Sequence, residues 1–362
     1  MFNDYIFVND EGNLQIEEWD CLDLVEKYET PIYAISENRI RDRFRRIYRA
    51  FKTRYHKIMI CFAYKANHGL AVKKILKQEG AGAETFGPHE LYSALLVGVS
   101  PDKIMCNSNN PSEEELTAAV QAGVYINVDN IDMLERVEDV SHKLGIVPKI
   151  NLRLKTSVEL RLRGADRKCG IDLESAYETT KNALKSEKIQ LVGYSEHLGG
   201  QTTLETFVLQ TSEMMDFVGR VKKGFNWQPH FIDLGTGFPT WRKEGHGVGG
   251  KDRKFPPIED YAEAIISKVN EKIEEYDLDE PTLIFEPGRY LVADSAVLLC
   301  KVGAIKQVEI GDKTFLKKVF VDANLNNIMR IATSNWYYHI VVANKADREP
   351  EEIVDIVGNT GW

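Results

Sequence analysis

The sequence predicts an α/β protein: a (β/α)8 barrel together with a small β domain built from both chain ends. Three observations indicate this fold. Eight short apolar segments of strand character follow one another, amphipathic segments of helical period lie between them, and after about residue 295 strand-like runs continue with little helix. A barrel is the most economical fold for eight strands that are separated by helices.

The barrel's elements follow in order from the pattern of apolar residues. The expected strands are residues 58–64, 81–86, 103–106, 125–128, 149–154, 191–197, 230–234 and 282–286. The expected helices are 69–78, 88–97, 112–122, 131–144, 173–186, 204–221 and 258–276; Ser112 and Glu115 form a capping-box pattern. The alternative is an open, doubly wound sheet, but the glycines at 80–82 lack the full Gly-x-Gly-x-x-Gly turn that it would require.

The two chain ends differ in character from the barrel. We expect residues 36–295 to form the barrel, and residues 1–35 and 296–362 to form the β domain, with strands at 296–308, 314–321 and 337–343. The glycine-rich basic segment 240–257 follows the seventh strand. It should lie at the barrel's C-terminal face, either as a mobile lid or as a surface loop without a role.

Composition excludes several classes of function. The 362-residue chain has a net charge of −9 and no basic block with interleaved aromatic residues, which argues against nucleic-acid binding. No apolar run approaches the ~20 residues of a membrane span, and no signal pattern opens the chain. The five cysteines show no Cys-x-x-Cys spacing, so we expect no metal site and a reducing, cytoplasmic location.

Lys65 is the first candidate for chemistry, because it ends the apolar run that begins at Ile58. A buried ammonium loses hydration, so such a lysine tends towards a lowered pKa and a nucleophilic amine, as a Schiff-base lysine requires. The alternative is a lysine whose ammonium reaches water beyond the strand end.

Further polar residues lie at the ends of the other predicted strands, where barrel enzymes carry their chemistry. They are Glu84, Arg153, His197, the turn 233–238 and the turn 286–289. Glycines in the last two turns leave backbone N–H groups free to hold a phosphate, although a Gly-x-Gly turn alone also serves conformation.

Glu286 and His197 each have two interpretations. Glu286 could pair with the protonated ring nitrogen of a pyridine cofactor or with a barrel arginine such as Arg153. His197 could stack on an aromatic cofactor or be an ordinary core residue. An amine, a carboxylate, an imidazole and phosphate-binding turns on one face together favour a pyridoxal 5'-phosphate site.

Five motifs, in order along the chain, resemble those of the fold-type III pyridoxal-phosphate decarboxylases. They are Tyr-Lys-Ala-Asn at 64–67, His-Leu-Gly-Gly-Gln at 197–201, Asp-Leu-Gly-Thr-Gly-Phe-Pro at 233–239, Glu-Pro-Gly-Arg-Tyr-Leu-Val-Ala at 286–293 and Val-Asp-Ala-Asn-Leu-Asn at 321–326. This family includes diaminopimelate, ornithine and carboxynorspermidine decarboxylases, with alanine racemase as a more distant relative. The resemblance covers nearly the whole chain and implies the family's alanine racemase-like barrel.

The resemblance implies a role for each matching residue. Lys65 would form the Schiff base with the cofactor, His197 would stack on its ring, and Glu286 would bind the pyridinium nitrogen. Glu84 stands where an aspartate is usual near the lysine. The other implied positions are Arg153 near the cofactor, Gly235, Thr236, Gly237, Gly288 and Arg289 around the phosphate, and Arg289, Arg330 and Tyr338 at the substrate.

The resemblance also implies an activity and a partner. We expect pyridoxal-phosphate-dependent decarboxylation of an amino acid with a distal polar group, such as a diaminopimelate-like compound. The alternatives are an amino-acid racemase and a non-catalytic subunit that binds the cofactor beside an active homologue. Family members receive a Cys-Glu-containing loop across a dimer, and this sequence stops near the equivalent point. We therefore expect a homodimer, or a heterodimer with a chain that supplies the loop.

Overall fold

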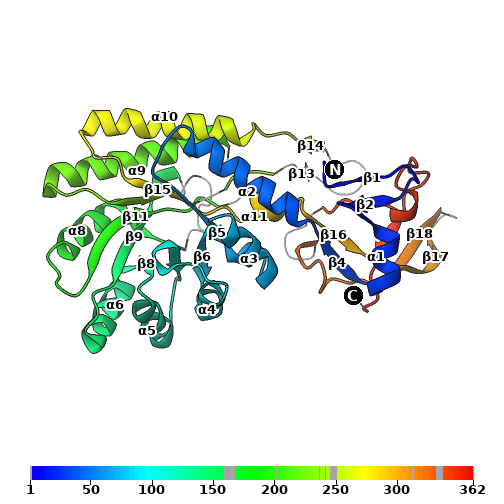
Figure 1. Ribbon diagram of the computed structural model, residues 1–362, viewed down its shortest axis with the longest axis horizontal. Coiled ribbons are helices and arrows are strands. Elements are labelled where there is room, and N and C mark those ends of the chain that lie inside the picture. Colours follow the sequence, from blue (N-terminus) through cyan, green and yellow to red (C-terminus); the bar gives the residue numbers. More distant parts are fainter. Residues whose placement is uncertain are drawn as a thin grey trace. The chain divides into compact units, whose positions relative to one another are not determined.

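The computed structural model describes residues 2–158, 161, 168–199, 203–235, 237–240, 242–244, 251–311, 314–331 and 337–361 (Figure 1). The chain forms two compact units. One contains Ile40–Thr240 and Phe255–Val292, and the other contains Met1–Arg39, Trp241–Lys254 and Ala293–Trp362. Both chain ends therefore belong to the same unit.

The larger unit is a closed barrel of eight parallel strands. The strand order is β9-β11-β12-β15-β5-β6-β7-β8, and pairing of β8 with β9 closes the ring. The strands are β5 (Ile58–Ala63), β6 (Gly82–Phe86), β7 (Ile104–Asn107), β8 (Tyr125–Val128), β9 (Lys149–Lys155), β11 (Gln190–Ser195), β12 (Phe231–Asp233) and β15 (Thr282–Phe285). A two-residue strand, β10 (Ile171–Asp172), pairs with the end of β9. The predicted barrel is confirmed.

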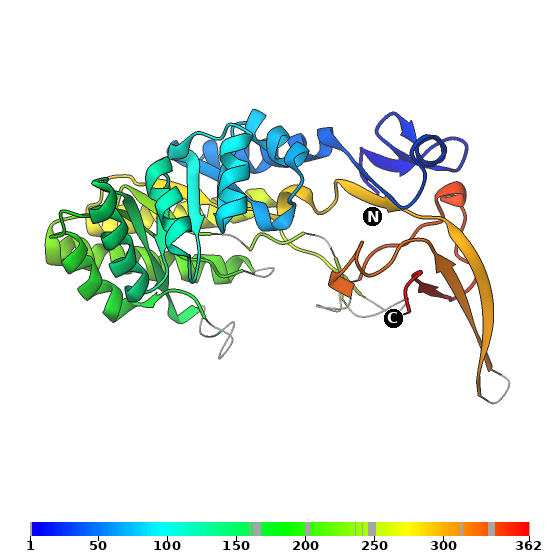
Figure 2. The ribbon, with the colours of Figure 1, turned by 90° about the horizontal axis from the view of Figure 1, so that it is seen from below.

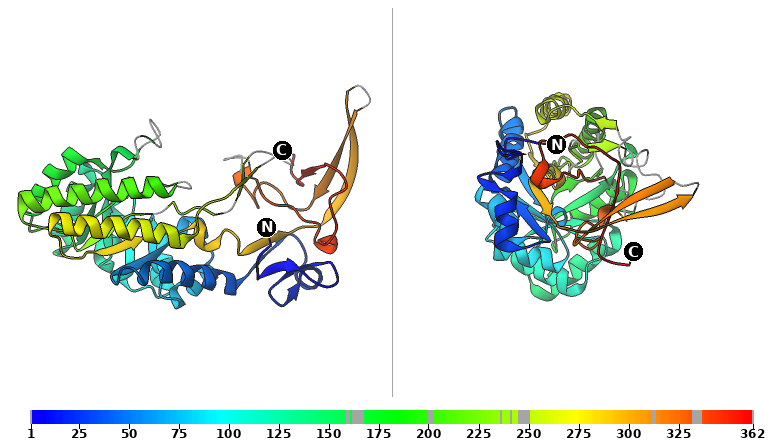
Figure 3. Two further views of the ribbon diagram at one scale, coloured as in Figure 1. Left: turned by 90° about the horizontal axis from the view of Figure 1, so that it is seen from above. Right: turned by 90° about the vertical axis from the view of Figure 1, so that its right-hand side faces the viewer.

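Helices alternate with these strands and lie outside them (Figure 1). They are α2 (Glu37–Lys52), α3 (Leu70–Gln78), α4 (Pro88–Leu96), α5 (Glu113–Ala122), α6 (Ile131–Leu144), α8 (Leu173–Ala183), α9 (Leu204–Phe225), α10 (Ile258–Tyr276) and the short α11 (Arg289–Val292). The long helices α9 and α10 lie side by side (Figure 3). Ser112 caps α5, as predicted, by accepting from the backbone nitrogen of Glu115 at 3.1 Å. Within the described residues, we find no helix both long and apolar enough to cross a membrane.

On strands β7 and β8, an apolar side chain is followed two residues later by an asparagine. A separate apolar cluster, drawn from five strands, consists of Cys61, Met105, Tyr125, Val192 and Ile284. Successive side chains of a strand point to opposite faces, so Asn107 shares the face of Met105, and Asn127 shares the face of Tyr125. Polar groups thus continue the same face at the end of the strands where barrel enzymes place their sites.

The second unit contains several small sheets and helix α1 (Cys21–Tyr28). One antiparallel sheet consists of β1 (Ile6–Val8), β2 (Leu14–Ile16) and β3 (Trp19–Asp20). Another joins the two chain ends, because β4 (Ile32–Ile35) pairs with β16 (Ala296–Leu299). A third consists of β17 (Val302–Gly311), β18 (Thr314–Val321) and β19 (Asp355–Val357), of which β17 and β18 form the long antiparallel pair in Figure 2.

Two strand predictions for this unit need correction. The run 296–308 is broken at 300–301 into β16 and β17, which pair with different partners. Residues 337–343 are not a strand: in the described chain residues 337–342 have no ladder partner, and the 3₁₀ turn Ala343–Lys345 follows. Their apolar and aromatic side chains have β propensity, but a strand also needs a neighbour, and β19 occupies the edge of β18. Within the segment expected as a loop, β13 (Arg242–Glu244) and β14 (Lys251–Arg253) pair.

Candidate active site

Lys65 lies directly after β5, in the 3₁₀ turn Tyr64–Ala66. Its Nζ atom donates to Oε2 of Glu84 at 2.9 Å. Glu84 comes from the neighbouring strand β6, where the register pairs it with Ala63. Half of the Lys65 side chain is exposed, whereas the Glu84 side chain is buried. The sequence thus places at a strand end an amine that is accessible to small molecules and is oriented by a buried carboxylate.

The pKa of Lys65 is raised above its ordinary value. Burial lowers this pKa, but the negative charges of Glu84 and Glu286 and the hydrogen bond to Glu84 outweigh burial and a smaller opposing contribution from Arg153. The expectation of a lowered pKa was therefore wrong, because it counted the hydration that the ammonium loses and not the carboxyl groups around it.

Glu286 is linked to Glu84 by one side-chain amide. Glu286 follows β15, is 2% exposed, and donates its backbone N–H to the carbonyl oxygen of Gly235 at 2.9 Å. Nδ2 of Asn107, at the end of β7, donates to Oε1 of Glu84 at 3.0 Å and to Oε1 of Glu286 at 3.1 Å. Asn107 received no role from the sequence, yet it joins the two carboxyl groups that face Lys65.

Arg153, on β9, pairs with Asp129 and not with Glu286. Its Nη1 atom lies 3.4 Å from Oδ1 of Asp129, which also accepts from the backbone nitrogen of Gly170 at 3.1 Å. Burial raises the pKa of Asp129, while the positive charge of Arg153 lowers it. The alternative interpretation of Glu286 as an ion-pair partner of Arg153 therefore has no support in the geometry.

Asp233, the last residue of β12, belongs to the same group of charges. Its Oδ1 atom accepts from the backbone nitrogen of Gly235 at 2.8 Å, and its charge acts on the buried carboxyl group of Glu286. Burial raises the pKa of both carboxyl groups. Asp233 thus adds to the negative charge around Glu286, a property that the motif at 233–239 did not reveal.

Two glycines bring the predicted turns against the strand ends that carry Lys65 and His197. Gly235 has φ +59°, and a Cβ atom there would lie 2.3 Å from the carbonyl oxygen of Glu196 and 2.9 Å from Nδ1 of His197. A Cβ atom on Gly288 would lie 2.9 Å from Cβ of Ala66. Only glycine permits these approaches. The turn after β12 therefore lies against His197, and the turn after β15 lies against the Lys65 turn.

The remaining predicted positions follow β12 and β15 or belong to the second unit. Gly237 follows β12, Arg289 begins α11, and Thr236 lies outside the described residues. Arg330, which is exposed, and Tyr338, which is half-buried, belong to the second unit. Their roles at the substrate stay predictions.

These donors fit pyridoxal phosphate. Lys65 offers an amine to an aldehyde, and the buried Glu286 offers a carboxyl group to a ring nitrogen. Residues 38–293 match a family profile described as "Pyridoxal-dependent decarboxylase, pyridoxal binding domain", which covers more than half of the chain. The chain belongs to the pyridoxal-dependent decarboxylases.

This decarboxylase has curated and structural relatives over nearly its whole length. It is 36% identical to the diaminopimelate decarboxylase of Methanothermobacter thermautotrophicus, over 99% of this chain and 81% of that protein. The crystal structure of diaminopimelate decarboxylase from Methanocaldococcus jannaschii with L-lysine superposes with a TM-score of 0.89 at 31% identity, over 99% of this chain and 82% of that one. Lysine/ornithine decarboxylase from Vibrio vulnificus, in complex with putrescine, shares the fold. Its identity is 18% and its TM-score 0.75, over 94% of this chain and 84% of that one. This decarboxylase therefore uses pyridoxal phosphate to decarboxylate an amino acid.

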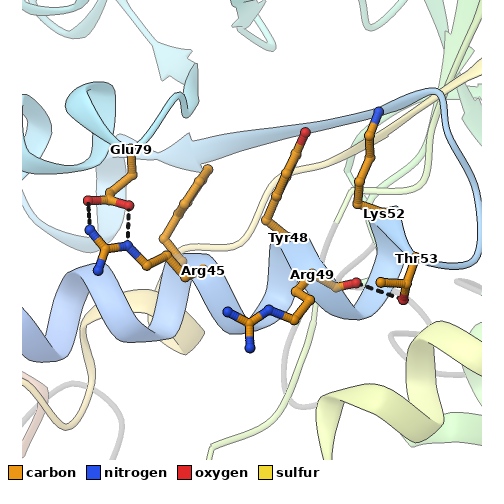
Figure 4. Close-up of a pocket in the computed structure, with 7 residues that line it drawn as sticks. Arg45, Tyr48, Arg49, Lys52, Thr53 and Glu79 are labelled. Atoms are coloured by element: carbon orange, nitrogen blue, oxygen red, sulfur yellow. Dashed lines mark hydrogen bonds and ion pairs between the residues drawn. The ribbon is translucent and has the colours of Figure 1, made fainter.

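A hollow of about 300 Å³ on the decarboxylase surface lies elsewhere, on α2. It is lined by Phe44, Arg45, Tyr48, Arg49, Lys52, Thr53 and Glu79. Arg45 donates to both carboxylate oxygens of Glu79, at 2.6 and 2.7 Å, while Arg49 and Lys52 point away from each other (Figure 4). Because these cations do not converge, we assign the hollow no ligand. Among the described residues, no group of three or more His, Cys, Asp or Glu side chains could hold a metal ion.

Proposed function

We propose that this decarboxylase acts on diaminopimelate or a closely similar amino acid with a distal carboxylate. The observation that carries the proposal is the 36% identity to a curated diaminopimelate decarboxylase over 99% of the chain. A further diaminopimelate decarboxylase, from Methanocaldococcus jannaschii, is 33% identical over 98% of the chain. Arg289 and Arg330 are the candidate partners for the substrate's anionic groups, because a guanidinium binds a carboxylate through two parallel hydrogen bonds.

We further propose the following roles for the site residues. Pyridoxal phosphate, when bound, supplies an aldehyde for an amine and a ring that takes up the electron pair left when CO₂ departs. Lys65 would hold the cofactor through its amine, which Glu84 orients. Glu286 would favour a proton on the ring nitrogen, and the neighbouring Asp233 would add negative charge beside it.

Other residues hold the cofactor in place in this proposal. His197, with Gly235 packed against its imidazole, supports the ring. Gly237 and Gly288 leave backbone N–H groups accessible to the phosphate, together with Arg289 at the start of α11. Arg153 contributes a positive charge from strand β9.

The experiment measures the substrate directly. The purified protein is loaded with pyridoxal phosphate and given diaminopimelate, ornithine, lysine or arginine, each labelled with ¹⁴C in the carboxyl groups. We expect ¹⁴CO₂ from diaminopimelate, with lysine as the product, because loss of one carboxyl group from diaminopimelate leaves lysine. Release from ornithine or arginine and not from diaminopimelate would overturn the substrate assignment. Exchange of the α-proton without CO₂ release would instead indicate a racemase.

We also propose that the active form is a dimer, most simply of two copies of this chain. The family resemblance implies that a partner supplies a Cys-Glu-containing loop, which could also come from a different chain. Exposed apolar side chains on the small sheets of the second unit support assembly, since Val302, Ile305 and Ile356 are 51%, 60% and 41% exposed. Light scattering at micromolar concentration tests it: a fully active species with the mass of one chain would refute the dimer.

A further inference from the structure

Three asparagines continue the polar layer beyond Glu84 and Glu286. Asn107, Asn127 and Asn151 come from the neighbouring strands β7, β8 and β9, and the register pairs each with the next. Nδ2 of Asn127 donates to Oδ1 of Asn107 at 2.6 Å, and Nδ2 of Asn151 donates to Oδ1 of Asn127 at 2.9 Å. All three side chains are buried. We call these three residues the amide chain.

The amide chain has a fixed direction. The Glu84 carboxylate, which is paired with Lys65, only accepts hydrogen bonds, so the NH₂ group of Asn107 must face it, and the Oδ1 atom of Asn107 must face Asn127. The same reasoning then orients Asn127 and Asn151 in turn. Each amide directs its positive end towards the two carboxyl groups, and hydrogen bonds in such a row polarise one another.

At the far end of the amide chain, the orientation of the amides leaves one oxygen without a hydrogen-bond donor in the described part of the protein. Oδ1 of Asn151 is buried and has no hydrogen-bond partner among the described residues. It faces Gly193 of β11, where a Cβ atom would lie 2.8 Å from it. A buried carbonyl oxygen without a donor is unfavourable, and most proteins avoid it. Rotating the Asn151 amide by half a turn would place its Oδ1 atom next to Oδ1 of Asn127. The orientation that lets Asn107 donate to both carboxyl groups therefore leaves Oδ1 of Asn151 without a donor from the residues described.

We propose that the amide chain is a positioning device for decarboxylation, in which Asn107 keeps Glu286 ionised and at a fixed distance from Glu84. A negative oxygen of Glu286 is then available to a protonated ring nitrogen. This inference rests on the proposed role of Glu286 and adds three residues to which the proposed function assigns no role. Hydrogen bonds to the ionised form of a carboxyl group lower its proton affinity.

The charges around Glu286 explain why such a donor is needed. Asp233, Glu84 and Lys65 act on the Glu286 carboxyl group, and the buried thiol of Cys61 lies within range of its charge. Burial and the two acidic neighbours raise the pKa of Glu286, and Lys65 opposes them. Of the charged groups named here, Lys65 alone favours the ionised form, and that lysine is the residue proposed to be consumed in binding the cofactor.

The test measures proton uptake at Glu286 in the cofactor-free protein. Carbon-13 NMR of protein labelled with [δ-¹³C]glutamate gives the titration midpoint of each buried carboxyl group, and Glu286→Gln and Glu84→Gln assign the signals. Asn107→Leu keeps the approximate shape and removes the donor, so we expect the proton affinity of Glu286 to rise about tenfold. Asn127→Leu contacts neither carboxyl group and should raise it roughly threefold, since Asn107 is then free to turn.

Thr85→Val is the matched control. The Thr85 hydroxyl is buried on β6 beside Glu84 and donates to the carbonyl oxygen of Met105 at 3.3 Å, but its side chain lies on the opposite face of the strand. We expect an unchanged Glu286 midpoint in this variant. Unchanged Glu286 midpoints in both asparagine variants would overturn the proposal and show that the amide chain serves only to pack the barrel. If Asn107→Leu does not fold, Asn127→Leu alone decides. The NMR measurement needs neither cofactor nor turnover, so a wild type without decarboxylase activity would refute the proposed function and not this inference.

Discussion

The Nζ atom of Lys65 and the Oε2 atom of Glu84 lie 2.9 Å apart, in an ion pair with one half-exposed and one buried partner. The exposed partner is the nucleophile of the proposed chemistry, and the buried partner is fixed by Asn107. Water screens part of the attraction on the lysine side, so the pair's main effect is on the orientation and proton affinity of the amine.

Glu84→Gln should lower the pKa of Lys65, because the variant removes the largest contribution that raises it. At pH 9 more of the amine is then neutral, and trinitrobenzenesulfonate should modify Lys65 several-fold faster than in the wild type. The modification rate is followed by mass spectrometry across pH 7–11. Lys143, an exposed lysine paired with Glu113, is the internal reference whose rate should not change. An unchanged Lys65 rate would contradict the electrostatic account.

The same pair has a defined effect on stability. A lysine whose pKa is raised in the folded protein stabilises the fold below its unfolded pKa of ~10.4, and this contribution is lost as the pH rises through the folded pKa. The stability difference between wild type and Glu84→Gln should therefore shrink above that pH. Urea unfolding at pH 8 and at pH 11 provides the comparison.

Lys65→Ala should abolish covalent attachment of pyridoxal phosphate. Borohydride reduction of the loaded wild type should fix the cofactor to the peptide that contains Lys65, as mass spectrometry would reveal. Lys73→Met is the control, because Lys73 is a buried lysine nearby, with its Nζ atom 4.3 Å from the centre of the Tyr64 ring and 2.7 Å from Oγ of Ser93. Label found on Lys73, or on any lysine other than Lys65, would refute the assignment.

Glu286→Gln should reduce turnover at least 100-fold while cofactor affinity changes far less. A neutral amide cannot hold a proton on the ring nitrogen, and two tenfold steps correspond to ~2.7 kcal/mol of activation free energy. The measurements are kcat for CO₂ release and the cofactor dissociation constant. Glu115→Gln is the control, because Glu115 is also a buried glutamate but lies on α5. This variant should retain normal turnover. Normal kcat in Glu286→Gln would make Glu286 a structural residue.

The sequence predicts the barrel well because its signal is local: each strand is an apolar run, and each helix has its own period and cap. It also marks Lys65 and Glu286 as candidates, because a charged residue after an apolar run is conspicuous. Asn107, Asn127 and Asn151 are not conspicuous, and their relation exists only through the register of β7, β8 and β9. Long-range pairing of this kind has no signature in one sequence. The raised pKa of Lys65 was missed for the same reason.

Gly235→Ala should destabilise the protein and weaken cofactor binding. The new Cβ atom would lie 2.3 Å from the carbonyl oxygen of Glu196 and 2.9 Å from Nδ1 of His197, so the imidazole must move. Gly145→Ala is a matched control, because Gly145 has a similar φ of +67° and nothing lies within 4 Å of its added Cβ atom. We expect ~1 kcal/mol of destabilisation in the control, from backbone strain, and ~1–3 kcal/mol more in Gly235→Ala. Equal melting temperatures and cofactor affinities for the two variants would show that Gly235 does not support His197.

Arg330→Ala should raise KM more for a substrate with a distal carboxylate than for one with a distal amine. A guanidinium stabilises a carboxylate through charge-assisted hydrogen bonds and gives an ammonium nothing comparable, so its loss affects only the first substrate class. The expected increase for diaminopimelate is about tenfold or more, corresponding to ~1.4 kcal/mol of lost binding. Arg348→Ala, at another exposed arginine of the second unit, is the control and should leave both KM values unchanged. Equal effects of Arg330→Ala on diaminopimelate and on ornithine would remove the argument that this arginine reads the distal carboxylate, and the substrate assignment would then rest on the relatives alone.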